Sequence, residues 1–207
     1  MANDDQIRAR GGLLPVDYPF GSFKKTYYRL LTSAAAGVYI GQPMAAQATG
    51  DVAPLALANS SCVCIGSVVG FLDTNLEALP SAMETTQAGA YLPANTDAYV
   101  AIADDPNQDF VVQEDTGGSA LTRANIFGNA AMIYRTSSGD TTTGYSTAEL
   151  DRSSAGTGTG GFLMLKEVHR QVNSDGTPNA PGNYCKWIVR ITSHQFGSFV
   201  APGGNQL

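Results

Sequence analysis

Short apolar stretches separated by turn residues dominate this chain, and their spacing predicts strands. In residues 184–196, YCKWIVRITSHQF, apolar side chains recur at every second position from Cys185 to Ile191. A period of two is typical of a strand that buries one face, and it turns Trp187 toward the core. Residues 162–172 are flanked by glycines and a polar turn, so they are also predicted to form a strand, with a helix as the alternative.

Two further strands are expected at 98–105 and 109–115. Residues 106–108 between them are typical of a hairpin turn, with a longer loop as the alternative. Residues 129–135 have the composition of another strand. The polar segment 137–161 has almost no apolar anchor before Leu150, so it is expected to be a long connection.

Glycine and proline break the first half of the chain into short pieces. Residues 62–73, CVCIGSVVGFLD, form an almost continuous run of apolar and small side chains, which is typical of a buried strand. Gly66 and Gly70 within this run indicate bulges or a close approach of another backbone. Helical character is confined to 76–87, where Pro80 leaves room for a short helix at most.

Residues 1–22 show no sustained period and are interrupted by glycine and proline, so an extended N-terminal arm is expected. The arm has too many apolar side chains for a simple disordered tail, and it is therefore predicted to dock on a surface. These side chains are Leu13, Leu14, Val16, Tyr18 and Phe20.

The predicted fold is mainly β with little helix. Its expected parts are the extended N-terminal arm (1–22), a small β-barrel-like unit (23–75), a larger antiparallel β-sandwich or barrel (76–200) and a loose tail (201–207).

Composition agrees with this class. The 207 residues are 43% hydrophobic but only 14% charged, against roughly 25% charged in typical globular proteins. A helical bundle or coiled coil is therefore not expected. Neither a membrane-spanning run nor an N-terminal secretory signal is found, so the chain is expected to stay in a cytosol-like compartment, away from membranes. The three cysteines are predicted to be small buried residues without disulfides.

The net charge of −6 makes nucleic acid an unfavourable partner. No Lys or Arg lies between Arg29 and Arg123, whereas ten acidic residues do. Two interpretations stay open: a solvated acidic face, or an acidic surface on which the basic arm of another copy lies. The candidate residues for that surface are Asp104, Asp105, Asp109, Glu114 and Asp115.

Motifs for catalysis or cofactor binding are almost absent. Residues 156–161 match G-x-G-x-x-G but follow a polar segment instead of a strand, and no phosphate-binding loop or nucleophile elbow occurs. The only histidines are His169 and His194, and the cysteines lack zinc-site spacing. The acidic run offers oxygen ligands for calcium but not the usual twelve-residue loop. We therefore expect no enzymatic activity, catalytic residue, metal or cofactor; a cluster of both histidines and an acid in a deep pocket would reverse this.

A series of short phrases in the second half carries a resemblance to a known family. In chain order they are Asp104-Asp105-Pro106, Gln113-Glu114-Asp115, Gly128-Asn129-Ala130, Thr143-Gly144-Tyr145-Ser146, Glu149-Leu150-Asp151 and His194-Gln195-Phe196. This order resembles the head decoration, or capsid cement, proteins of tailed bacteriophages. The first half is similar only in outline, and no single phrase is diagnostic.

The resemblance implies a non-enzymatic structural virion protein, made in the host cytoplasm, that binds the major capsid protein on the outside of the shell and stabilises it. It also implies a small homo-oligomer, with a trimer favoured, and an arm that contacts the shell or a neighbour. The expected contact residues are Arg8, Arg10, Leu13, Leu14, Tyr18 and Phe20. The alternative is another phage structural β-module, either a tail or baseplate component or a carbohydrate-binding appendage.

Overall fold

The structure, a computed structural model, describes most of the chain. The described residues are 11–16, 23–31, 36–57, 62–79, 91–156, 161–173 and 176–197, with Thr136 described by its backbone. Within these ranges the protein has eleven strands and one short 3-10 helix, η1 (Arg123–Asn125), and no α-helix. The mainly β fold predicted from the sequence is confirmed.

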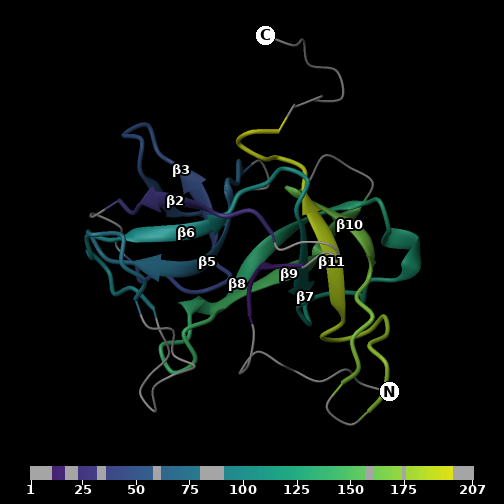
Figure 1. The fold of residues 1–207 in the computed structure, drawn as a ribbon. Coiled ribbons are helices and arrows are strands. Elements are labelled where there is room, and N and C mark those ends of the chain that lie inside the picture. The colour runs from purple at the N-terminus through teal and green to yellow at the C-terminus, as the bar shows by residue number, and fades with distance from the viewer. Residues whose placement is uncertain are drawn as a thin grey trace, which may run out of the picture.

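The larger sheet has six strands, each antiparallel to its neighbours (Figure 1). From one edge to the other they are β1 (Leu14–Pro15), β7 (Asp109–Gln113), β11 (Lys186–Ile191), β10 (Leu163–Val168), β8 (Asn129–Gly139) and β9 (Ser146–Gly156). Directly after β7, Glu114 forms a bridge with Leu150 in β9. The sheet is therefore curled into a partly closed barrel.

The interior of this curled sheet is filled by large side chains. Trp187, Phe110 and Phe162 are each fully buried there. Along β11, Trp187, Val189 and Ile191 all belong to this core, as the period-two pattern predicts. Burial of a large apolar side chain stabilises a fold by about 1.5–3 kcal/mol, so this layer is the main source of cohesion in the larger sheet.

The smaller sheet has five antiparallel strands and a core of its own. In spatial order they are β2 (Thr26–Arg29), β6 (Tyr99–Ala103), β5 (Gly66–Leu72), β3 (Pro43–Ala46) and β4 (Val52–Pro54). The register of β5 on β6 shifts between Val68 and Gly70. At Gly66, which has φ +145°, a Cβ would lie 2.1 Å from the carbonyl oxygen of Ala103. The predicted bulge and close backbone approach are confirmed.

The predicted hairpin between residues 98 and 115 is wrong, although both of its strands form. Strand β6 pairs with β2 and β5, whereas β7 pairs with β1 and β11. A turn at Asp105, whose carbonyl accepts the Gln108 N–H over 2.9 Å, carries the chain from one sheet to the other. A local turn signal does not determine which sheet each flanking strand joins. The smaller sheet consequently includes a strand from beyond residue 75.

The expected long connection over 137–161 is also wrong, because most of it belongs to β8 and β9. Strand β9 is eleven residues long and pairs with β8 despite its polar composition, with register shifts between Asn129 and Ala131 and between Tyr134 and Gly139. Its hydroxyls bond to backbone: Ser146 Oγ donates to the Ser138 carbonyl over 3.0 Å, and Ser154 Oγ accepts the Ala131 N–H over 2.8 Å. Residues 157–160 of the glycine-rich motif lie outside the described residues.

Residues 162–172 contain β10, so the strand is confirmed over the helical alternative. Most of the possible helix at 76–87, and the tail 201–207, lie outside the described residues. In the part of the chain that is described, no helix is long and apolar enough to cross a membrane.

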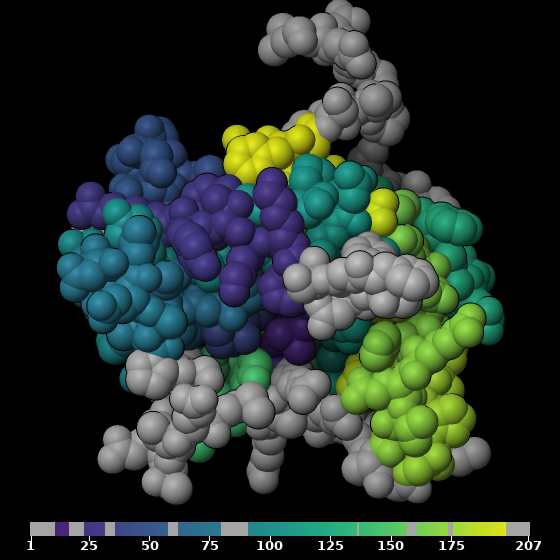
Figure 2. All heavy atoms as spheres, viewed as in Figure 1, coloured from purple at the N-terminus to yellow at the C-terminus, as the bar shows by residue number. Residues whose placement is uncertain are grey.

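The two sheets are tied together along one seam. The backbone of Cys64 pairs with that of His194 in an isolated β-bridge, and Ile40 pairs with Tyr145 in the same way. Figure 2 shows the yellow segment that follows β11 lying against blue residues of the first half. Residues 11–16 also join this seam: the Gly12 N–H donates to Ala148 in β9, and the Leu13 N–H donates to Gly41, just before β3. The two sheets and this segment therefore form one connected body.

Candidate functional site

The six arm residues expected to make contacts are placed very differently. Leu13 is fully buried in the core of the larger sheet, so it stabilises its own chain and is not exposed to a partner. Leu14 is half-buried. The other four lie outside the described residues: Arg8, Arg10, Tyr18 and Phe20.

The acidic residues do not form an exposed surface. Asp104, Asp109, Glu114 and Asp115 are each at most 7% exposed, and Asp105 is half-buried. Asp109 accepts hydrogen bonds from Lys166 over 2.6 Å and from Arg190 over 2.8 Å. Burial alone would raise the pKa of Asp109, but these two cations hold it below its ordinary value. Most of these carboxylates are therefore buried and make their contacts inside the fold, and they do not form an exposed surface for a partner.

Glu114 is the most deeply buried of these acids. Its Oε2 accepts the Trp187 indole N–H over 2.8 Å, and its Oε1 lies 3.6 Å from Arg152 Nη1. Burial raises the pKa of Glu114 to about 7, although Trp187 and Arg152 act to lower it. Arg152 also donates to the carbonyls of Thr116 and Gly117, so it fastens the segment after β7 onto β9.

Two of the phrases that carry the family resemblance lie side by side in this part of the fold. The Asp115 N–H donates to the Leu150 carbonyl over 3.0 Å, which joins two of the phrases across the curled sheet. The His194 Nδ1 accepts the Phe196 N–H over 3.0 Å at the seam between the sheets. The Asp115–Leu150 contact holds two segments of the larger sheet together.

Nothing in the described ranges is arranged to hold a metal: no group of three or more His, Cys, Asp or Glu side chains has a suitable geometry. Within the acidic run considered for calcium, Asp109 pairs with Lys166 and Arg190, and Asp115 pairs with Arg152. The three cysteines are buried and form no disulfide, as predicted. Burial raises the pKa of Cys64 and of Cys185 to about 12, so neither is a reactive thiolate.

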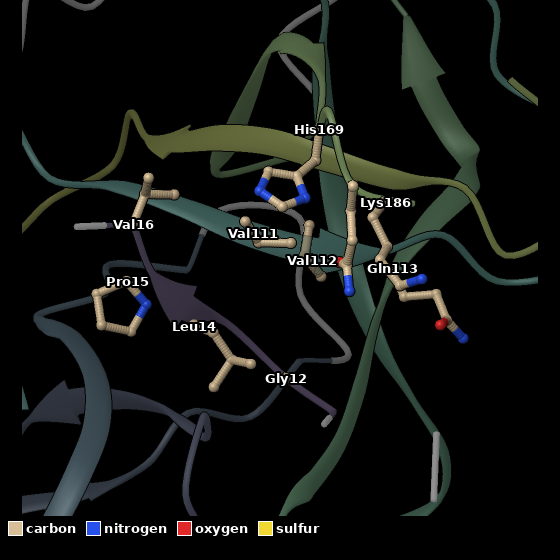
Figure 3. Close-up of a pocket in the computed structure, with 10 residues that line it drawn as sticks. Gly12, Leu14, Pro15, Val16, Val111, Val112, Gln113, His169 and Lys186 are labelled. Atoms are coloured by element: carbon tan, nitrogen blue, oxygen red, sulfur yellow. The ribbon is translucent and has the colours of Figure 1, made fainter. Parts of the chain in front are cut away.

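A cavity of about 340 Å³ lies beside β1 on the outer face of the larger sheet (Figure 3). It faces away from the core because successive strand side chains alternate: Leu13 enters the core, whereas Leu14 lines the cavity. Figure 3 shows His169 and Lys186 on one side, and Leu14, Pro15 and Val16 on the other. The described residues that line the cavity are Gly12, Leu14, Pro15, Val16, Val111, Val112, Gln113, His169, Gln171 and Lys186.

The polar side of this cavity contains a lysine that is more buried than lysines usually are. Lys186 is 5% exposed and is the one formally charged side chain in the described part of the lining. Burial, and then the charge of Lys186, lower the pKa of His169, while Gln171 and Glu167 act in the opposite direction. The buried Nδ1 of His169 has no hydrogen-bond partner among the described residues. Sequence reasoning missed Lys186, because alternation in β11 places it on the face expected to be solvated.

A second notable feature is Phe127, which follows η1 and is 78% exposed. Its φ is +68°, a left-handed conformation that large side chains rarely adopt. The Phe127 N–H donates to the Leu165 carbonyl over 2.8 Å, which fixes this turn against β10. A groove is lined by Arg123 of η1 and by residues 167–172 and 178–181, and it includes the exposed Val172. The sequence signal for Phe127 was an aromatic residue immediately before the Gly128 phrase.

Comparisons of this chain with protein-family models, with curated proteins and with solved structures find no match.

Proposed function

We propose that this protein is a structural component of a phage head that binds the outside of the capsid shell and strengthens it without catalysing a reaction. Its partner in this proposal is the major capsid protein, and it acts as a small homo-oligomer, with a trimer favoured. The observation that carries the proposal is the exposed Phe127 in its constrained turn.

Exposed apolar side chains are common and mean little singly. Phe127 differs because its backbone conformation costs a non-glycine residue about 1–2 kcal/mol, and its side chain, 78% exposed, gains little from burial within the chain. Asn or Gly would adopt the same φ more easily. An aromatic residue held in this way is suited to anchor a protein interface, where aromatic side chains supply much of the binding energy.

The rest of the molecule suits an adhesive role. Its two sheets are tied by the bridges Cys64–His194 and Ile40–Tyr145, so a contact at one end acts on a connected body. Weak contacts add strongly when many copies bind one lattice, since a tethered second contact has a high effective concentration. Of the expected arm contacts, Leu13 is withdrawn because it is fully buried. The others remain part of the proposal, with Phe127 added: Arg8, Arg10, Leu14, Tyr18 and Phe20.

The test is co-sedimentation of the full chain with expanded, DNA-free shells of the phage that encodes it. Wild-type protein should bind, and Phe127→Asn should reduce binding at least about tenfold, the equivalent of 1.4 kcal/mol. The same variant should leave the thermal midpoint of the isolated protein unchanged or higher, because Asn tolerates this backbone conformation. Loss of binding together with retained stability separates a contact role from a folding role.

The matched control is Tyr27→Ser, which removes a 49% exposed aromatic from β2 in the smaller sheet and should leave binding unchanged. Wild-type protein that does not bind shells would refute the proposal, and equal binding by Phe127→Asn would remove Phe127 from it. Attachment to tails or to glycans would favour the alternative of another structural β-module.

A further inference from the structure

We infer that the cavity beside β1 is a binding site for a small amphipathic carboxylate, with the carboxylate at Lys186 and His169 and the aliphatic part against Leu14 and Val111. The inference goes beyond the capsid proposal and does not depend on it, since all the residues that carry it belong to one chain.

The size and walls of the cavity fit a small organic ligand. Its volume of about 340 Å³ lies within the range of roughly 300–1,000 Å³ typical of ligand pockets. Leu14, Pro15, Val16 and Val111 provide one apolar side, while Gln113, His169, Gln171 and Lys186 provide the polar side. A ligand that covers both sides must therefore carry an aliphatic part and a polar head.

The charge of the lining determines whether the polar head of the ligand should be negative or positive. Among the described residues that line the cavity, Lys186 carries the one formal charge and none has a carboxylate. A cation at 5% exposure acts through a less polar medium than water, so it attracts an anion and repels a cation more strongly than a surface lysine would. An ammonium has three N–H donors, so a ligand oxygen can add to the contacts that Lys186 already makes within the chain.

His169 provides an independent indication of a ligand. Buried polar atoms in folded proteins are almost always hydrogen-bonded, yet the buried Nδ1 of His169 has no partner among the described residues. When Nδ1 of His169 carries a proton, it can donate a hydrogen bond to a carboxylate oxygen of the ligand. Because Lys186 and burial lower the pKa of His169, a bound anion should raise that pKa again.

Straight-chain probes test the inference on the full chain. Calorimetric titration should detect saturable binding of octanoate, whereas octylamine, octanol and inorganic phosphate should bind at least about tenfold more weakly, since each lacks the anionic head or the aliphatic part. Lys186→Met should weaken octanoate binding by about tenfold or more, because the variant loses a charged hydrogen-bond donor to the carboxylate. Lys25→Met, at an exposed lysine outside the cavity, is the matched control and should leave binding unchanged.

Two further measurements keep the test decisive if Lys186→Met does not fold. Leu14→Glu places a carboxylate at the cavity from a half-buried edge strand, and it should block octanoate. In wild-type protein, octanoate should raise the pKa of the His169 ring measured by NMR, with Lys186, Gln171 and Glu167 as the groups that act on it. Equal binding of octylamine or octanol, no saturable binding of octanoate at millimolar concentration, or an unmoved His169 pKa would each overturn the inference.

Discussion

Glu114 makes the stability of this protein depend on pH. Its pKa is about 7 in the folded state against 4.5 for an ordinary glutamate, and burial is the largest cause. Between these values the folded state keeps a proton that the unfolded state releases. The contribution of Glu114 to the free energy of unfolding is therefore largest below pH 4.5, decreases as pH rises to about 7, and is constant above it.

The expected decrease is at most about 3 kcal/mol, and Glu114→Gln should abolish it while Gln can still accept the Trp187 N–H. His169 and His194 have pKa values lowered by burial, so they remove stability as pH falls below 6.5 and oppose this trend. The informative quantity is therefore the wild-type minus Glu114→Gln difference in urea unfolding, followed across this pH range. A difference that does not vary with pH would contradict the assignment.

The sequence pointed to several important residues but did not show whether they are buried or which side chains they contact. Asp109, Glu114 and Asp115 stood out as an acidic run, but their burial depends on Lys166 and Arg152, which reach them from β10 and β9. Such pairs lie far apart along the chain, so composition alone suggests an exposed acidic face. The prediction for Trp187 succeeded because strand alternation is a local property.

The local sequence pattern predicted which segments form strands better than it predicted which strands pair with each other. Strands β6, β7, β10 and β11 lie within the ranges expected from apolar spacing. Strand β9 was missed because its sequence is mostly polar: Ala148 and Leu150 enter the core, but the Ser146 and Ser154 hydroxyls bond to backbone. The division of β6 and β7 between two sheets is set by non-local pairing, which a three-residue turn does not encode.

The pairing of β5 with β6 should be intolerant of a side chain at Gly66. A Cβ there would meet the Ala103 backbone at 2.1 Å, and φ is +145°. Gly66→Ala should therefore lower the free energy of unfolding by about 2–4 kcal/mol, measured by denaturant titration. Gly50→Ala is the matched control, because φ is +87° but no atom lies within 4 Å of its Cβ. It should cost only about 1–2 kcal/mol, and equal costs at both sites would argue against the close approach.

The two cores should unfold in one transition, because backbone pairing joins the sheets at Cys64–His194 and Ile40–Tyr145. Trp187 is the only tryptophan and lies in the core of the larger sheet, so its fluorescence reports that sheet alone. Far-ultraviolet circular dichroism reports both sheets. The two probes should give coincident denaturant curves, and a separate transition seen only by circular dichroism would contradict the expected coupling.

The position of β1 has a mechanical consequence. Gly12 is bonded to Ala148 and Val16 to Asp109 in the larger sheet, while Leu13 is bonded to Gly41 beside the smaller one. A force that pulls on the chain ahead of Gly11 would therefore act on both sheets at once. Part of this force would be directed along the seam between the sheets, so that several hydrogen bonds would resist it together. If the N-terminal residues tether this protein to a swelling shell, the force would be shared across the whole body before any single strand could peel away.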